Sequence, residues 1–250
     1  MKINVLIPMG KKEFFDETTR YPKWLIEVGG KLMVQVGYDN FKDLPYEIHP
    51  VFIIRDDDCS EYHLDNICQI MTDNHCDLIK LHHDTLGAAC SCLMAVKYID
   101  NDTPLIIANY DHLFLDGCVQ LALDFFERNN ADGGVLCFDT MHPRWSFVRI
   151  DETGCVVEAA EKRPLSRNGI AGFYYFRQGH LFVDAAKRSI LKNTQINGCF
   201  FIAPVLNELI LDNRKILPYL LKNRDYFSFF TADKVAEYNK SFNCNEKTNE

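Results

Sequence analysis

Apolar runs and helically spaced apolar positions alternate along the first half of the chain. Residues 2–8 and 47–55 are rich in β-branched side chains, and Val51-Phe52-Ile53-Ile54 within the second run is typical of a strand buried on both faces. Strands that alternate with helices predict a mostly parallel, doubly wound sheet with right-handed crossovers. The pattern predicts further short strands at 76–81 and 104–108, and helices over 31–42, 57–71, 87–98 and 117–129.

The pattern changes after Asp139. Residues 147–150 and 156–159 predict a hairpin about the turn Asp151-Glu152-Thr153-Gly154. The sequence contains no linker, repeat or low-complexity block, so we predict a single domain over residues 1–242, followed by a polar tail over 243–250. The later part of that domain is predicted to contain an aromatic strand at 171–176 and helices over about 179–192 and 201–212.

Composition narrows the class of protein. With 250 residues, of which 47% are hydrophobic and 25% charged, the chain can bury a full core. A net charge of −8 without a Lys/Arg cluster excludes a protein that coats nucleic acid. Pro8 interrupts the first apolar run too early for a signal peptide, and no run approaches the roughly 20 residues of a membrane span. Ten scattered cysteines then favour reduced thiols and a cytoplasmic location, with no membrane partner.

Glycines and cations follow two of the predicted strands, where ligands of such sheets bind. The first segment could offer backbone N–H groups and charge to phosphate oxygens, or be an ordinary surface loop. The second, at a helix start, could admit a flat ligand close to the backbone, or simply begin a helix with Asp84 or Thr85 as N-cap. The candidate residues are Pro8, Met9, Gly10, Lys11 and Lys12 in the first segment, and Thr85, Gly87 and Ala88 in the second.

Carboxylates follow two other predicted strands. Asn109-Tyr110-Asp111 comes directly after an apolar strand, where Asp111 could hold Mg²⁺ or could cap a turn. Glu161 and Lys162 come after the hairpin, where Lys162 could clamp a phosphate or belong to a charged loop.

Together these segments resemble the sugar-nucleotidyltransferase (NDP-sugar pyrophosphorylase) family, particularly its small capsule- and surface-polysaccharide members. The resemblance runs from Lys2 to about Leu211, with the motifs in the family's order. It is carried by Pro22-Lys23, Leu25-Ile26-Glu27-Val28-Gly29-Gly30-Lys31, Gly87-Ala88-Ala89, Leu105-Ile106-Ile107-Ala108-Asn109-Tyr110-Asp111, Glu161-Lys162-Arg163-Pro164 and Ala171-Gly172-Phe173-Tyr174-Tyr175-Phe176.

The resemblance implies a Rossmann-like three-layer sandwich, with a nucleotide-binding part over about 1–140 and an acceptor-binding part over about 141–242. It implies a reaction that joins a nucleoside triphosphate to a sugar 1-phosphate or a related phosphorylated small molecule and releases pyrophosphate, with Mg²⁺ as cofactor. It leaves the oligomeric state open. Carried over, its catalytic set is Lys23, Asp111 and Lys162, with Asp111 on the metal; Gly10, Gly87, Ala88 and Asn109 lie at the nucleotide, and Trp145, Ser146, Glu161, Lys162 and Gly172 at the acceptor.

The first loop departs from the family pattern. The family's loop is glycine-rich and ends in an arginine, whereas Glu13 stands at that place here. An acid facing a triphosphate would repel it, and a lysine does not reproduce the fork of an arginine. Two alternatives therefore stay open: a glycosyltransferase-like enzyme that uses an activated nucleotide sugar, and a non-catalytic descendant that binds a nucleotide or a partner protein.

Overall fold

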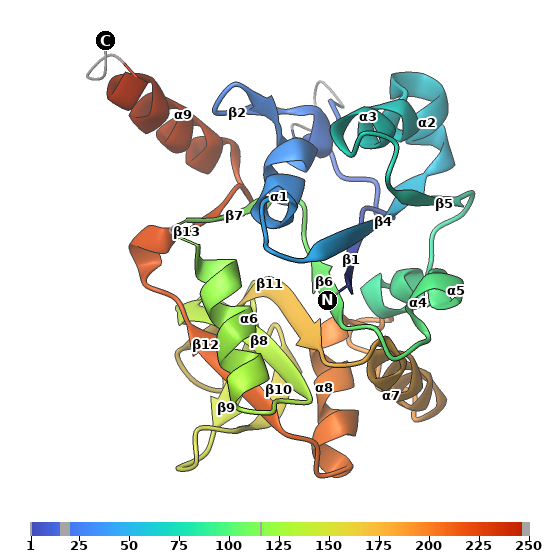
Figure 1. The fold of residues 1–250 in the computed structure, drawn as a ribbon, viewed down its shortest axis with the longest axis vertical. Coiled ribbons are helices and arrows are strands. Elements are labelled where there is room, and N and C mark those ends of the chain that lie inside the picture. The colour runs from blue at the N-terminus through green and yellow to red at the C-terminus, as the bar shows by residue number, and fades with distance from the viewer. Residues whose placement is uncertain (1, 16–20, 116, 247–250) are drawn as a thin grey trace.

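A mixed β-sheet forms the centre of the molecule (Figure 1). The computed structural model describes residues 2–15, 21–115 and 117–246, and within them the main sheet has nine strands. Its parallel part has the order β6-β1-β4-β5. From β1 the chain first adds β4 and β5 on one side and then returns to add β6 on the other side, so the strand order reverses at β1. The bounds are Lys2–Pro8 for β1, Glu47–Arg55 for β4, Asp77–Leu81 for β5 and Leu105–Ala108 for β6.

The later strands extend this sheet by antiparallel pairing. The long strand β11 (Asn168–Phe176) runs antiparallel to both β6 and β8 (Gly133–Asp139). The predicted hairpin is present as β9 (Ser146–Ile150) and β10 (Val156–Glu161), and β12 (Ile216–Leu220) pairs parallel with β8. The predicted single α/β domain is thus confirmed. Its sheet has a parallel part, and β11 joins to it a second part that contains antiparallel pairs.

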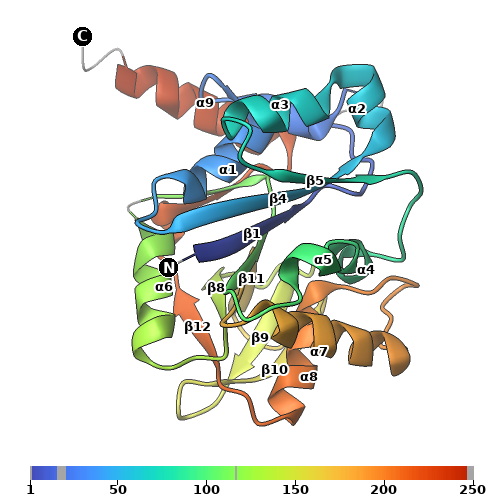
Figure 2. The same ribbon diagram turned by 45° about the vertical axis from the view of Figure 1, so that its right-hand side comes forward.

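Helices cover both faces of the sheet, as the view in Figure 2 shows. Alternate side chains of β4 enter different cores: Phe52 and Ile54 pack on the side of α1 (Met33–Lys42), whereas Val51 and Ile53 pack on the side of α7 (Gly179–Leu191). This alternation is the period of a strand buried on both faces. The first layer contains α1 (Met33–Lys42), α2 (Asp56–Tyr62), α3 (Leu64–Met71) and α6 (Cys118–Arg128); the second contains α4 (Ala88–Leu93), α5 (Val96–Ile99), α7 (Gly179–Leu191) and α8 (Ile202–Leu211).

Several elements differ from the sequence-based expectation. The predicted helix over 57–71 is divided into α2 and α3 at His63, whose left-handed φ of 57° interrupts the helix, and the one over 87–98 is divided into α4 and α5. Helix α9 continues to Glu246, into the segment predicted as a tail, and 247–250 lie outside the described residues. The elements that the pattern did not predict are β2 (Glu27–Val28), β3 (Lys31–Leu32), β7 (His112–Phe114), β8, β12, β13 (Tyr226–Ser228), α9 (Ala232–Glu246) and the 3₁₀ helices η1 (Lys23–Leu25) and η2 (Asn223–Asp225).

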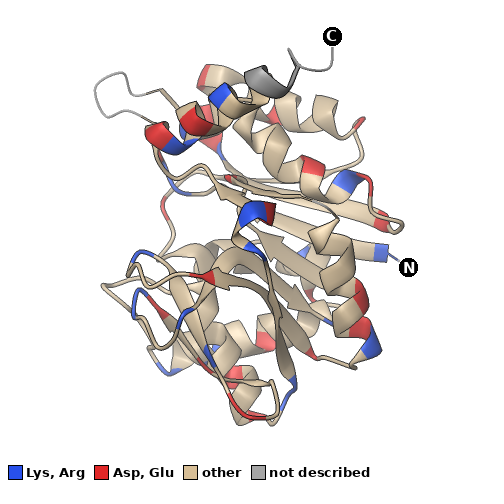
Figure 3. Ribbon diagram, turned by 90° about the vertical axis from the view of Figure 1, so that its left-hand side faces the viewer, with Lys and Arg blue, Asp and Glu red and all other residues tan. Residues whose placement is uncertain are grey.

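The surface and the core agree with the composition. Figure 3 shows acidic and basic residues mixed over the face turned toward the viewer.

Among the described helices, none has the length and apolar character needed to cross a bilayer. Cys68, Cys92 and Cys137 are free thiols buried in the core, and burial raises the pKa of each.

Candidate functional site

The predicted site residues gather at the carboxyl edge of the parallel strands. Because β1 lies between β4 and β6, and β5 lies beside β4, the segments that follow these strands are neighbours in space. Residues 9–13 follow β1, 82–85 follow β5 and 109–111 follow β6. Open α/β sheets bind their ligands at this edge, next to the point where the strand order reverses.

Lys23 and Asp111 form a buried ion pair at this edge. Lys23 opens η1, its backbone N–H donates to the Glu13 carbonyl at 3.0 Å, and its side chain is 7% exposed. The Lys23 ammonium group bonds Oδ2 of Asp111, whose side chain is 11% exposed. The pair therefore joins the chain after β6 to the segment behind the first loop.

Glu13 lies at the same position and is surrounded by cations. Its Oε2 is 3.9 Å from Lys23 Nζ and accepts a hydrogen bond from Tyr110 Oη at 3.3 Å, and its Oε1 is 3.1 Å from Lys11 Nζ. The negative charge that the sequence places in the loop is thus compensated by two lysines. Its expected repulsion of a triphosphate is weakened accordingly.

The second oxygen of Asp111 faces a histidine. Oδ1 is 3.2 Å from Nε2 of His112, while Nδ1 of His112 donates to the Ala171 carbonyl at 2.7 Å. Burial raises the pKa of Asp111, but the positive charges of His112 and Lys23 outweigh it, so that the pKa lies below its usual value. Burial lowers the pKa of His112, and the nearby carboxylate opposes that shift. Asp111 is therefore a carboxylate at neutral pH despite being buried.

Gly172 fits closely against the end of β6. It has a left-handed φ of +63°, and an added Cβ would lie 2.5 Å from His112 Cε1 and 2.7 Å from Asn109 Nδ2. The Asn109 N–H also donates to the Gly172 carbonyl at 3.0 Å. The exposed Asn109 and the buried Gly172 are thus brought together beside Asp111.

The first loop and the segment after β5 meet at Ser91. A Cβ on Gly10 would lie 2.6 Å from Leu81 Cδ1 and 3.3 Å from Ser91 Oγ, and Ser91 Oγ is 2.6 Å from Thr85 Oγ1. Met9 is buried, with its N–H donating to the Ile53 carbonyl at 2.7 Å. The loop begins at the half-buried Pro8, and Lys11 and Lys12 are exposed.

The fold itself requires a glycine at position 87. Gly87 has a φ of +108°, and an added Cβ would lie 2.5 Å from the Phe200 carbonyl oxygen. The Ala89 N–H donates to that carbonyl, and Phe200 N–H donates to the Leu86 carbonyl. The alternative with Asp84 or Thr85 as N-cap is wrong, because the residue before α4 is Gly87. Ala88 is half-buried and opens the helix.

The predicted acceptor residues form a second group around the hairpin. Ser146 Oγ donates to the Glu161 carboxylate, and Lys162 N–H donates to the Trp145 carbonyl at 3.0 Å. The ring of Trp145 packs edge-on against the His112 ring at 6.0 Å, which connects this group to Asp111. Burial raises the pKa of Glu161, against the effects of the Ser146 hydrogen bond and the Lys162 charge.

Lys162 lies beside Phe201 and a surface groove. It has a left-handed φ of 53°, and its ammonium group lies 5.0 Å from the centre of the Phe201 ring. Beside it is a groove of about 630 Å³, lined by Glu161, Lys162, Arg163, Thr194, Gln195 and Asn207 among others. The structure thus brings Lys23 and Asp111 into contact and places Lys162 at the groove.

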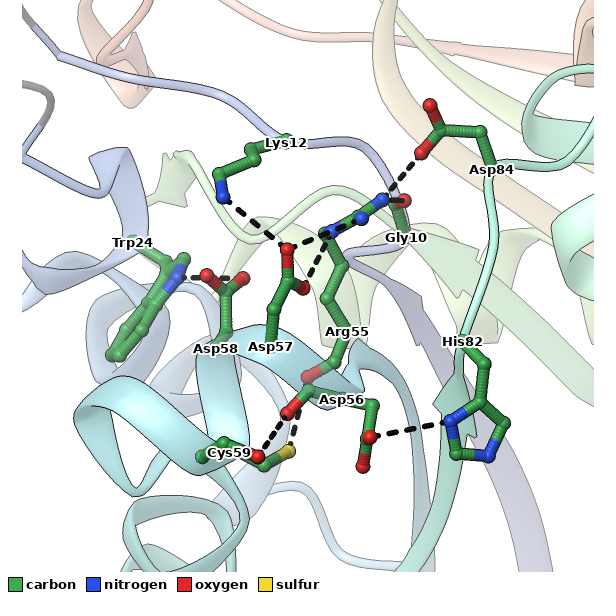
Figure 4. Close-up of polar contacts among 11 residues, drawn as sticks. Gly10, Lys12, Trp24, Arg55, Asp56, Asp57, Asp58, Cys59, His82 and Asp84 are labelled. Carbon is green, nitrogen blue, oxygen red and sulfur yellow. Dashed lines mark hydrogen bonds and ion pairs between the residues drawn. The ribbon is translucent and has the colours of Figure 1, made fainter.

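Sequence analysis missed Arg55, which lies among the predicted nucleotide-binding residues (Figure 4). It ends β4, and its guanidinium group reaches the Gly10 carbonyl and the Asp84 carboxylate. Arg55 is the last residue of the predicted strand 47–55, so the rule that selected Asp111, a polar residue after a strand, did not include it. The same rule extended to charged residues at the end of a strand would have found it.

Comparison with known proteins identifies the fold. No protein-family profile and no curated protein matches the sequence. A nucleoside-diphosphate-sugar pyrophosphorylase from Vibrio cholerae RC9 matches with a TM-score of 0.77 and 20% identity, over 96% of this chain and 100% of that chain. A UDP-glucose pyrophosphorylase complexed with UDP-glucose matches with a TM-score of 0.76 and 14% identity, over 98% and 100%. The inositol-1-phosphate CTP transferase from T. maritima matches with a TM-score of 0.73 and 13% identity, over 96% and 95%. The chain therefore has the mixed α/β, Rossmann-like fold of nucleotide-sugar pyrophosphorylases and related nucleotidyltransferases.

Proposed function

We propose that this protein is a nucleotidyltransferase. It joins a nucleoside triphosphate to a sugar 1-phosphate or a related phosphorylated small molecule, and it releases pyrophosphate. The observation that carries the proposal is the buried Lys23–Asp111 pair. It lies at the strand edge between the Gly10 loop, with its lysines, and the hairpin that carries Glu161 and Lys162, in a fold that nucleotide-sugar pyrophosphorylases share.

The residues around Lys23 fit a magnesium ion. The ammonium group of Lys23 contacts Asp111 and lies 3.9 Å from Glu13, so two carboxylates face one position that already holds a positive charge. Mg²⁺ asks for one or two carboxylates when phosphates and waters supply its other ligands. Asp111 would hold the ion, with Glu13 beside it. The ion would neutralise the charge of the phosphate oxygens.

The remaining steps rest on residues of this chain. Attack of a phosphate oxygen on the α-phosphorus requires alignment and charge neutralisation rather than a strong base. Lys23, at the position beside Asp111, would donate to a phosphate oxygen of the nucleotide. Glu161, oriented by Ser146, would accept a hydrogen bond from an acceptor hydroxyl, and Lys162 would bind the acceptor phosphate at the groove.

A place in surface-polysaccharide precursor synthesis is part of the proposal, and it rests on the resemblance of the sequence to the small family members. The cytoplasm is the proposed compartment, supported by buried free thiols such as those of Cys68 and Cys92. The groove beside Lys162 is the proposed position of the phosphorylated acceptor.

The test follows pyrophosphate release and nucleotide binding in parallel. The protein is incubated with Mg²⁺, each ribonucleoside triphosphate or dTTP, and a panel of sugar 1-phosphates and other phosphorylated small molecules. Thermal shifts are recorded with the same nucleotides and with nucleoside diphosphate sugars, because a ligand of the folded state raises stability. Pyrophosphate from one triphosphate–acceptor pair supports the proposal. Stabilisation by a diphosphate sugar without pyrophosphate release supports the glycosyltransferase-like alternative, and nucleotide binding without turnover supports the non-catalytic one.

A further inference from the structure

Arg55 lies between the two loops that carry the predicted nucleotide-binding residues (Figure 4). It is the last residue of β4, whose neighbours in the sheet are β1 on one side and β5 on the other. Gly10 belongs to the loop after β1, and Asp84 to the segment after β5. A long side chain at the end of β4 can therefore reach both loops, and that of Arg55 does.

Asp57 fixes one edge of the guanidinium group. Arg55 Nε donates to Asp57 Oδ1 at 2.8 Å and Nη2 donates to Oδ2 at 3.2 Å, a bidentate pair. Lys12 Nζ also donates to Asp57 Oδ2 at 3.2 Å, so the carboxylate is held from two sides. The Arg55 side chain is only 11% exposed. A planar fork held in this way has its remaining donors at a set position, which is the property that separates arginine from lysine.

The remaining donor of the guanidinium group, Nη1, is paired with an exposed carboxylate, that of Asp84. Nη1 of Arg55 donates to the Gly10 carbonyl at 3.4 Å and to the carboxylate of Asp84. Asp84 is 82% exposed, whereas Asp57 is 39% exposed. An ion pair to so exposed a carboxylate contributes little to stability, because water competes for it. Asp84 thus marks an anion position that directly adjoins the Gly10 loop.

We propose that Nη1 of Arg55 binds a phosphate oxygen of the nucleoside triphosphate, and that Asp84 occupies this position while no nucleotide is bound. The identity of the ligand rests on the proposed function. Arg55 then supplies, from the end of β4, an arginine donor next to the first loop (residues 9–13), which has no arginine of its own. Asp84 is a competitor that the phosphate displaces into solvent.

The test compares three probes on the full chain at a fixed Mg²⁺ concentration. The probes are the nucleoside triphosphate that gives the largest thermal shift, the same nucleoside without phosphates, and inorganic tripolyphosphate. Calorimetric titration gives the dissociation constants for the wild type, Arg55→Gln and Asp84→Asn. Arg167→Gln is the matched control, because Arg167 makes a similar bidentate pair with Asp139 at 2.7 and 2.8 Å on the surface.

Arg55→Gln is expected to weaken both phosphate probes about tenfold to a hundredfold, the value of one charge-assisted hydrogen bond. The nucleoside affinity should not change. Asp84→Asn should strengthen triphosphate binding several-fold, since it keeps the shape of the side chain and removes the competing charge. Arg167→Gln should bind all three probes as the wild type does.

Equal weakening of nucleoside and triphosphate in Arg55→Gln would show that Arg55 only holds the loops together, and would overturn the inference. Unchanged triphosphate affinity in Arg55→Gln, or weaker affinity in Asp84→Asn, would overturn it as well. A wild type that binds tripolyphosphate but no nucleotide, with the expected loss in Arg55→Gln, would contradict the proposed function and support the anion site. A wild type that binds none of the probes would contradict both.

Discussion

The ammonium group of Lys23 bonds the carboxylate of Asp111 and lies 3.9 Å from that of Glu13. The first loop, η1 and the segment after β6 thus share one charged position at the carboxyl edge of the sheet. Asp111 and Glu13 carry two negative charges there; Lys23 contributes one positive charge between them, and Lys11 lies 3.1 Å from Glu13. A second cation at this position would have to displace the lysine, and the displaced ammonium group would then be available to another anion.

Removing Lys23 should destabilise the folded chain. Lys23→Met removes the ammonium group from the buried Asp111 carboxylate and leaves it beside His112, whose pKa is lowered by burial, and loss of one partner of a buried pair costs about 3 kcal/mol. The double variant Lys23→Met/Asp111→Asn should recover much of this loss, because no buried charge is left unpaired. Urea unfolding of the two single variants and the double variant checks this. Strictly additive changes in the free energy of unfolding would show that the pair is not coupled.

Replacing Gly172 by alanine should lower the free energy of unfolding more than replacing Gly154, a glycine that also has a positive φ. Gly154 has a φ of +82° and no heavy atom within 4 Å of an added Cβ, so Gly154→Ala tests the cost of the left-handed backbone alone, about 1 kcal/mol. Gly172→Ala adds the contacts with His112 and Asn109, and we expect a further loss of about 1–3 kcal/mol from overpacking. Equal losses in the two variants would contradict the tight fit beside Asp111.

Glu161 should make stability depend on pH. Burial raises its pKa in the folded chain above the unfolded value, so ionisation is less favourable in the folded state. The contribution of Glu161 to wild-type stability should therefore fall as pH rises from below the unfolded pKa, about 4.3, through the raised folded pKa. Glu161→Gln still accepts the Ser146 hydrogen bond and lacks this loss. Its free energy of unfolding, relative to the wild type, should increase with pH across that window. A difference that stays constant from pH 4 to pH 8 would contradict the shift.

The fold could be predicted where one local pattern decides the structure. The sequence alone predicts β1, β4 and the hairpin of β9 and β10, because their apolar pattern indicates directly which side chains are buried. Strand β8 begins with Gly133-Gly134, which suggests a turn, yet an added Cβ on Gly134 would lie 2.5 Å from Phe126. The packing of α6 against the sheet, a tertiary effect, therefore decides that strand.

The candidate site could be predicted residue by residue but not as an arrangement. Position after a strand was enough to select Asp111 and the Gly10 loop. The contacts of Glu13 with Lys11 and Lys23 depend on the conformation of the first loop. The spacing of these residues in the sequence does not predict that conformation. Gly87 was selected for its freedom to approach a ligand, whereas its φ of +108° also serves its contact with Phe200.

The most direct test of the proposed function is the initial rate of pyrophosphate release by Asp111→Asn. The rate is measured with the triphosphate–acceptor pair that the wild type uses, and Asp139→Asn serves as the control because Asp139 is a surface carboxylate paired with Arg167. We predict a loss of about a hundredfold or more in Asp111→Asn, the effect of removing a group that stabilises developing charge, and a wild-type rate in Asp139→Asn. A wild-type rate in Asp111→Asn, or a wild type that releases no pyrophosphate with any pair, would contradict the proposed function.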